Sequence, residues 1–251
     1  MTDHPPLPPA AAAGASRTFD LVIFDCDGVL VDSEIISCLT VARMLERHGV
    51  RCDVTTVLTR YLGRPASTVI DDFSRLARRP LPPGFVDDWR AELFAAFARD
   101  LVPMPGAREA VEGLRLSAID YCLASSSDEE RIEVALRKAG LFDFFEGRIF
   151  STTMVERGKP APDLFLLAAA TRGAAPGRCV VVEDSVAGVV AARAAGMTAV
   201  AFTAGSHYRV MDQTQPLLDA GASCVAASMP ELRLLLARMS AAGVAPADAW
   251  R

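Results

Sequence analysis

The chain has 251 residues, of which 51% are hydrophobic and 23% are charged, and its mean hydropathy is positive. This length and composition exclude a disordered or collagen-like chain and allow one large domain, or a core that carries a second, smaller one. The net charge is -5 and no run of Lys and Arg occurs. Because a phosphate backbone is bound by a basic field, these charges argue against a nucleic-acid partner.

Membrane association is also not expected. No apolar stretch approaches the roughly 18 residues that cross a bilayer, and the amino terminus lacks the basic flank and apolar run of a signal peptide. The six cysteines stand far apart, which predicts reduced, buried thiols and no metal knuckle. We therefore expect a cytoplasmic protein without a membrane partner, present as a monomer or weak homodimer.

Residues 1–17 are rich in proline and alanine and predict a disordered tail. After them, short apolar runs alternate with amphipathic patterns, a rhythm typical of an α/β protein. The runs predict strands at 21–24, 119–124, 179–182 and 198–202, and the patterns predict helices at 128–139, 162–171 and 186–195. Such alternation indicates a parallel sheet covered on both faces, with ligands bound outside the carboxyl ends of the strands.

The segment 37–103 breaks this rhythm. It contains helical patterns at 41–48, 65–78 and 84–99, and no strand-like run. We interpret it as a helical cap inserted into a core formed by residues 18–36 and 104–251.

The most informative motif is Asp25-Cys26-Asp27-Gly28, which places two carboxylates at the end of a predicted strand, followed by a glycine that lets the backbone approach a ligand. One carboxylate could attack phosphorus while the other donates a proton to the leaving oxygen. The alternative is that Asp25 and Asp27 simply cap the following turn. Only three histidines occur, without a G-x-S-x-G or H-E-x-x-H pattern, so the chemistry is expected to rest on carboxylates.

This segment resembles the first motif of the haloacid dehalogenase superfamily, D-x-D-G-x-[LV]-x-D-[ST]. Three further motifs follow in the family's order: Ser125 at a strand end, Lys159 within 158–163, and Glu183-Asp184 within 181–188. The resemblance covers residues 19 to about 236 and implies a Rossmann-like parallel sheet core with an inserted all-helical cap. It also implies a Mg²⁺-dependent phosphatase acting on a small phosphorylated metabolite.

The resemblance assigns roles to these residues. Asp25 is implied as the nucleophile that forms an aspartyl-phosphate, and Asp27 as the acid and base. Mg²⁺ is implied between the Asp25 carboxylate, the Asp27 main-chain carbonyl and Asp184, since it prefers oxygen ligands. Glu183 is placed beside the metal, directly or through water, and Lys159 is implied as a second cation at the phosphate.

Phosphate binding is expected from Gly28, Ser125 and backbone N–H groups, with Ser126 as a further candidate. Serines at a strand-to-helix turn routinely satisfy the helix end, and this is the favoured interpretation of both Ser126 and Ser127. Arg64 could grip a substrate phosphate or carboxylate from the cap.

Three other polar residues are expected outside the catalytic group. Asp32 is predicted to support the first loop, and Lys138 to lie on a solvated helix face. His207 is expected at the surface, with a position at the edge of the site as the alternative.

Within the superfamily, Asp27 and the Glu183-Asp184 pair argue against a dehalogenase, which needs neither a metal nor the second aspartate. A phosphonate hydrolase needs a cap lysine, and residues 37–103 contain none. β-Phosphoglucomutase remains an alternative, although the positions of its histidine and arginine hold Ser37 and Ala66 here. A receiver-like phosphate-binding domain is a weaker alternative, because receivers lack a helical cap. We expect a phosphatase for sugar, sugar-acid or polyol phosphates.

Overall fold

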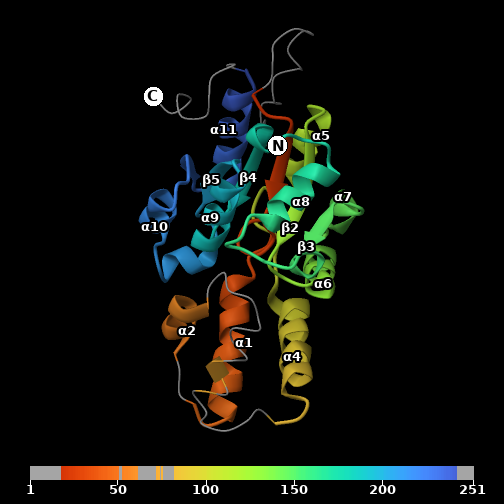
Figure 1. Cartoon of the computed structure of the whole chain (residues 1–251). Helices are drawn as coiled ribbons and strands as arrows, with labels where there is room; N and C mark the ends of the chain where they lie inside the picture. Colours follow the sequence, from red (N-terminus) through yellow and green to blue (C-terminus); the bar gives the residue numbers. More distant parts are fainter. Residues whose placement is uncertain (1–17, 51–52, 62–71, 74, 76–81, 242–251) are drawn as a thin grey trace, which may run out of the picture.

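The core of the protein is a six-stranded sheet in the order β3-β2-β1-β4-β5-β6, and all neighbouring strands are parallel. The computed structural model (Figure 1) describes residues 18–50, 53–61, 72–73, 75 and 82–241. The strands are β1 (Leu21–Phe24), β2 (Asp120–Ser125), β3 (Ile149–Ser151), β4 (Cys179–Glu183), β5 (Thr198–Phe202) and β6 (Cys224–Ala226). The predicted α/β class with a parallel sheet is therefore confirmed.

The four strands expected from the sequence are the four central ones. The sequence prediction missed β3 and β6, which lie at the two edges of the sheet and have three residues each. Three residues are too few to display a strand period, so these edges leave no readable pattern.

Helices cover both faces of the sheet. One apolar layer lies between the sheet and α5 (Ala107–Leu116), α6 (Glu129–Ala139), α7 (Phe142–Phe145) and α11 (Met229–Ala241); the other lies between the sheet and α8 (Asp163–Thr171), α9 (Val186–Ala194) and α10 (Thr214–Asp219). Val22 and Phe24 of β1 belong to the first layer, and Leu21 and Ile23 belong to the second. Burial of both faces is the reason that β1 reads as an uninterrupted apolar run.

The ends of α6 follow the sequence closely. The side chain of Asp128 accepts a hydrogen bond from the N–H of Arg131, and Gly140 closes the helix with φ 67°. The helix therefore begins at Glu129, one residue later than the start predicted from the sequence. A glycine suits the left-handed closing position because it has no Cβ.

A second group of helices stands beyond the carboxyl ends of the strands (Figure 1). It contains α1 (Glu34–Arg47), α2 (Val54–Tyr61) and α4 (Phe85–Asp100), which share a separate apolar cluster with Phe73. In the described part of 37–103 all regular elements are helices. The expected boundary between residues 36 and 37 lies inside α1, and the division into core and cap stays a prediction.

Several predictions fall on residues outside the described ranges. These are the tail at 1–17, Arg64, Ala66, Cys52, and the helix expected at 65–78 except for Asp72, Phe73 and Arg75, which are helical.

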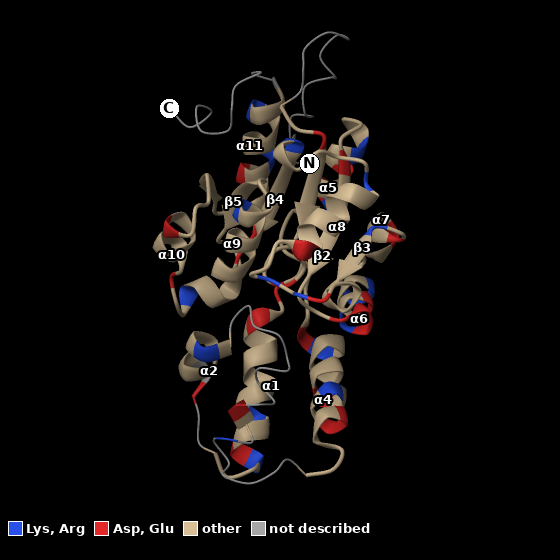
Figure 2. Cartoon of the chain, in the orientation of Figure 1, with Lys and Arg blue, Asp and Glu red and all other residues tan. Residues whose placement is uncertain are grey.

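The other five cysteines are buried and free. None of the described helices combines the length and apolar character that a membrane span requires. Figure 2 shows both acidic and basic residues on α1 and on α4.

Candidate active site

Asp25 is the first residue after β1 and is held against β4, because its N–H donates to the carbonyl of Val182 over 3.0 Å. Its side chain is buried, and Oδ1 accepts a hydrogen bond from Lys159 Nζ at 2.7 Å. The adjacent strand β2 ends at Ser125, which is 1% exposed. The parallel pairing of β1 with β2 and β4 therefore brings the first, second and fourth sequence motifs to one edge of the sheet.

Lys159 lies on the loop before α8 and is buried within the same group. Besides Asp25, its Nζ donates to Glu183 Oε1 at 2.5 Å and to the carbonyl of Ala124 at 3.0 Å. An ammonium group has three donors, so all of them are used. These negative partners raise the pKa of Lys159 further than burial lowers it, which keeps the side chain charged.

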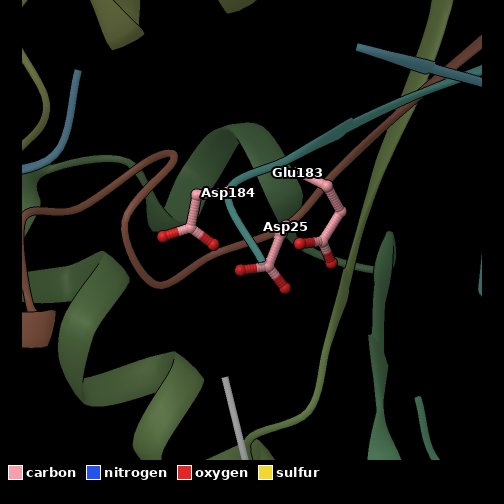
Figure 3. A group of neighbouring side chains, drawn as sticks. All are labelled: Asp25, Glu183 and Asp184. Carbon is pink, nitrogen blue, oxygen red and sulfur yellow. The ribbon is translucent and has the colours of Figure 1, made fainter. Parts of the chain in front are cut away.

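The carboxylates of Asp25, Glu183 and Asp184 form a cluster in which one oxygen atom of each lies within 4.8 Å of the others. Figure 3 shows the three side chains next to each other with their carboxylates pointing in a similar direction. Glu183 is the most constrained of the three, because Ser185 donates to Oε2 through both its N–H (3.1 Å) and its hydroxyl (2.9 Å). Lys159 occupies the other oxygen, Oε1.

The electrostatics of this region suit a divalent cation. Five carboxyl groups interact with only two cationic side chains in the described part of the chain: Asp25, Asp27, Glu34, Glu183 and Asp184, with Lys159 and Arg131. Burial and the neighbouring carboxylates raise the pKa of Asp25 to about 7, in spite of Lys159, and raise the pKa of Asp184 well above its usual range. The hard oxygen donors and the excess of negative charge therefore fit Mg²⁺.

Asp27 has different partners. Its Oδ1 accepts from the Ser33 hydroxyl at 2.5 Å and from Arg131 Nη2 at 2.9 Å, and its Oδ2 accepts from the Ser127 hydroxyl at 2.8 Å. Burial alone would raise the pKa of Asp27, but the charge of Arg131 and these hydrogen bonds lower it below the usual range. The two aspartates of the first motif thus lie in opposite environments, which is typical of residues with separate acid–base roles.

Gly28 lets the first loop pass close to Asp184. Its φ is 76°, and a Cβ built on it would lie 1.8 Å from Asp184 Oδ2. No other residue fits this position, because the conformation is left-handed and the space is already filled.

The family model for haloacid dehalogenase-like hydrolases matches residues 19–196, which is most of the chain and includes all the residues described above. The chain belongs to this family. "6-Phosphogluconate phosphatase" of Escherichia coli (strain K12) is 31% identical over 191 residues, covering 75% of this chain and 84% of that protein.

Two solved structures of this family are also similar. A haloacid dehalogenase-like protein of unknown function from Agrobacterium tumefaciens is 37% identical with a TM-score of 0.74, covering 88% of this chain and 99% of the other. A HAD family hydrolase from Deinococcus radiodurans, described with bound phosphate and sodium, is 34% identical with a TM-score of 0.74 and covers 90% of this chain and 99% of the other.

The structure brings together most of the residues that the haloacid dehalogenase resemblance selected. Asp25, Asp27, Gly28, Ser125, Lys159, Glu183 and Asp184 all lie at the carboxyl edge of the central strands. Ser126 is half-buried on the loop after β2, and Arg64 lies outside the described residues. The roles of these residues in binding and catalysis stay predictions.

The sequence analysis missed Arg131 and Glu34. Arg131 lies in the first turn of α6, where its guanidinium contacts Asp27 and, through Nη2 at 3.1 Å, the Ser37 hydroxyl. Glu34 begins α1, and burial together with Asp27 and other nearby carboxylates raises its pKa to about 8. The signal available for Arg131 was its position in the first helical turn, where an acidic residue is favoured and a cation is unusual.

Two minor expectations require correction. Ser127 does not cap α6, because Asp128 does, and its hydroxyl binds Asp27 instead. His207 is 1% exposed and not at the surface, because η3 (Ser206–Arg209) folds back onto the loop after β4. Lys138 is exposed as expected, but its Nζ donates to the carbonyl of Ala98 in α4 at 2.6 Å. The expectation for Asp32 is confirmed, since it accepts two hydrogen bonds from Ser206.

Proposed function

We propose that this protein is a Mg²⁺-dependent phosphatase that hydrolyses a small sugar, sugar-acid or polyol phosphate through an aspartyl-phosphate on Asp25. The observation that carries the proposal is the position of Asp25, which lies at the end of the central strand β1 within 4.8 Å of two further carboxylates and in contact with Lys159. The similarity to a phosphatase of a sugar-acid phosphate supports the substrate class.

The reaction proceeds in two steps. A carboxylate oxygen of Asp25 attacks phosphorus, the bond from phosphorus to the leaving oxygen breaks, and Asp27 gives that oxygen a proton. Asp27 then takes a proton from water while the water oxygen attacks phosphorus and the bond to Asp25 breaks. Both residues return to their initial state.

The positive charge that this reaction needs comes from two sources. Mg²⁺ held by the carboxylates of Asp25 and Asp184 and the main-chain carbonyl of Asp27 would offset the repulsion between a phosphate dianion and a carboxylate. Lys159 contributes a fixed cation in direct contact with Asp25 Oδ1. The Ser125 hydroxyl accepts from the Ser127 N–H and keeps its own proton to donate to a phosphate oxygen.

The resting arrangement of Asp27 suits the second step. Its lowered pKa holds it ionised and ready to accept a proton from water. The first step requires the protonated form, so the side chain must take up a proton from solvent before it can donate. We expect this when substrate binding displaces the donors from Ser33, Ser127 and Arg131.

The test is phosphate release from a panel of sugar, sugar-acid and polyol phosphates in Mg²⁺. We expect turnover with Mg²⁺, loss of turnover in EDTA, and inhibition by Ca²⁺, whose looser and higher coordination misplaces the nucleophile. Asp25→Asn should abolish phosphate release while the protein stays folded. Full activity in EDTA, or wild-type activity of Asp25→Asn, would contradict the proposal.

The mutase alternative is tested separately, with β-glucose 1-phosphate and traces of the bisphosphate. Ser37 is buried and occupied by hydrogen bonds to Arg131 and to the Ser33 carbonyl, so it offers no acid–base group in place of a histidine. We expect free phosphate to accumulate faster than glucose 6-phosphate, and the reverse order would favour a mutase.

A further inference from the structure

Three consecutive residues of η3 reach the two loops that carry the acidic cluster. Ser206 donates through its N–H (3.0 Å) and its hydroxyl (2.9 Å) to Asp32 Oδ1, in the loop after β1. Tyr208 donates its hydroxyl to the main-chain carbonyl of Asp184 at 2.6 Å, in the loop after β4. Between them, His207 Nε2 lies 3.3 Å from Asp184 Oδ2. This short helix therefore connects the first motif with the fourth.

His207 and Asp184 are unusual because both are buried with unsatisfied polar atoms. His207 is 1% exposed, and within the described part of the chain neither of its ring nitrogens, nor Asp184 Oδ2, has a hydrogen bond. Buried polar atoms almost always have partners, since leaving one without a partner is costly. The separation of 3.3 Å between the two groups is within reach of a hydrogen bond after a small rotation of either side chain.

Two glycines make the space in which the imidazole meets Asp184. A Cβ on Gly205 would lie 2.5 Å from His207 Cε1, and a Cβ on Gly28 would lie 3.1 Å from the same atom. Any side chain at Gly205 would therefore displace the ring from its present position. Both glycines leave room for His207 beside Asp184.

His207 contacts Asp184 from outside the carboxylate cluster. One oxygen atom each of Asp25, Glu183 and Asp184 lies within 4.8 Å of the others, and His207 is not a member of that group. Its ring contacts the Asp184 carboxylate alone among the three. It can therefore orient that carboxylate without itself binding the cation.

We propose that His207 is a positioning residue for the metal site, and that its Nε2–H donates to Asp184 Oδ2 and fixes the carboxylate with its other oxygen toward Asp25. The inference rests on the proposed Mg²⁺ dependence and goes beyond it. Groups that hydrogen-bond to metal-ligating carboxylates set their orientation, and their removal weakens metal binding by about 10- to 100-fold.

The test is calorimetric titration of the full-length, metal-free protein with Mg²⁺, without substrate. We expect His207→Ala to bind Mg²⁺ about 10- to 100-fold more weakly than the wild type. His207→Gln, whose side-chain N–H reaches as far as Nε2, should retain most of the affinity, and His207→Asn, which is shorter, should not. The control is Arg209→Ala, an exposed residue of the same short helix, which should leave the affinity unchanged.

The outcomes separate the inference from the proposed function. A wild-type protein that does not bind Mg²⁺ would contradict the proposed metal dependence. A wild-type protein that binds, together with His207→Ala or His207→Asn of equal affinity, would overturn the positioning role. If His207→Gln binds as weakly as His207→Asn, the ring acts through its shape and not through its N–H. Thermal unfolding in EDTA identifies any variant that has failed to fold, and the Gln and Asn variants still decide the question if the Ala variant does not fold.

Discussion

Lys159 is surrounded by acceptors in three directions, from Asp25, Glu183 and the carbonyl of Ala124. Its side chain is 2% exposed. A compact ammonium satisfies this geometry, whereas a guanidinium is broader, planar and arranged for bidentate contacts. We expect Lys159→Arg to lower kcat at least about tenfold, equivalent to about 1.4 kcal/mol in the barrier. Steady-state phosphate release measures this.

The matched control for this substitution is Lys138→Arg, at the chain's only other lysine. Lys138 is exposed and donates to one carbonyl, a contact that an arginine can also make. We expect no measurable change in kcat. Equal kcat values for Lys159→Arg and the wild type would contradict the prediction and show that Lys159 serves only as a structural cation.

Gly28 is under two constraints, a left-handed backbone conformation and the close approach of Asp184, and two alanine substitutions separate their effects. Gly28→Ala places a Cβ against Asp184 in a left-handed conformation, whereas Gly147→Ala, at φ 70°, has no atom within 4 Å of the new Cβ. Left-handed conformation alone costs about 1–2 kcal/mol for a residue with a Cβ. We expect Gly147→Ala to lose about this much stability with unchanged kcat, and Gly28→Ala to lose more stability and nearly all activity. Denaturant unfolding and phosphate release on both variants check this, and an active Gly28→Ala would mean that Asp184 can move aside.

At the scale of elements, Asp120 joins three parts of the α/β core. It begins β2 and accepts hydrogen bonds from Arg172, at the end of α8, and from Arg148, just before β3. Burial opposes its ionisation, but the hydrogen bonds from Arg172 and Arg148 outweigh burial and lower its pKa below 3.8. The stabilisation it provides is therefore present above pH 3.8 and is lost as the pH falls through the lower pKa of the folded state.

We expect Asp120→Asn to reduce the free energy of unfolding by about 1 kcal/mol near neutral pH, because these partly exposed ion pairs are screened by solvent. The difference from the wild type should shrink as the pH falls below 3.8. Urea unfolding between neutral and acidic pH measures it, with Glu146→Gln, an exposed residue, as the control. A difference that stays constant with pH would show that the charge of Asp120 is not what stabilises the fold.

The sequence predicted the elements that are long and buried on both faces. β1 and β4 have clear apolar runs, and their polar ends locate Asp25 and Glu183 because parallel strands end at one edge. β3 and β6, with three residues each, carry too little pattern to be recognised.

Residues that join the site from outside the motifs were harder to predict. Arg131 is one of many arginines, and its contact with Asp27 depends on the direction in which α6 leaves the sheet. His207 follows a polar turn that reads as surface, and its burial depends on how η3 packs against the loop after β4. Such contacts are set by tertiary packing and not by local pattern.

At the scale of the whole molecule, we expect the acidic cluster to stabilise the folded state when Mg²⁺ is bound and to destabilise it when Mg²⁺ is removed. Burial and neighbouring carboxylates raise the pKa of Asp184, so its ionised form destabilises the metal-free protein. Mg²⁺ should reverse this, since a ligand at 100 times its Kd stabilises the folded state by about 2.7 kcal/mol.

We therefore expect Asp184→Asn to unfold in EDTA at a temperature equal to or above that of the wild type, and to lose the increase in Tm that Mg²⁺ gives the wild type. Thermal unfolding with EDTA or Mg²⁺ measures both effects. Asp87→Asn, an exposed change in α4, should keep the Mg²⁺ response. A large loss of stability in metal-free Asp184→Asn would contradict the idea that this charge is unfavourable there.

The place of β1 in the sheet has a consequence for the growing polypeptide on the ribosome. β1 is the first strand to be made, but it pairs with residues 120–123 on one side and 179–182 on the other. β1 therefore lacks its two neighbouring strands until most of the chain has been translated. The edge of the sheet that carries the carboxylate cluster cannot assemble before β4 emerges. Contacts between segments so distant in sequence slow folding and leave apolar strands exposed in the meantime. Expression at low temperature, or with chaperones that bind nascent apolar segments, is expected to raise the soluble yield.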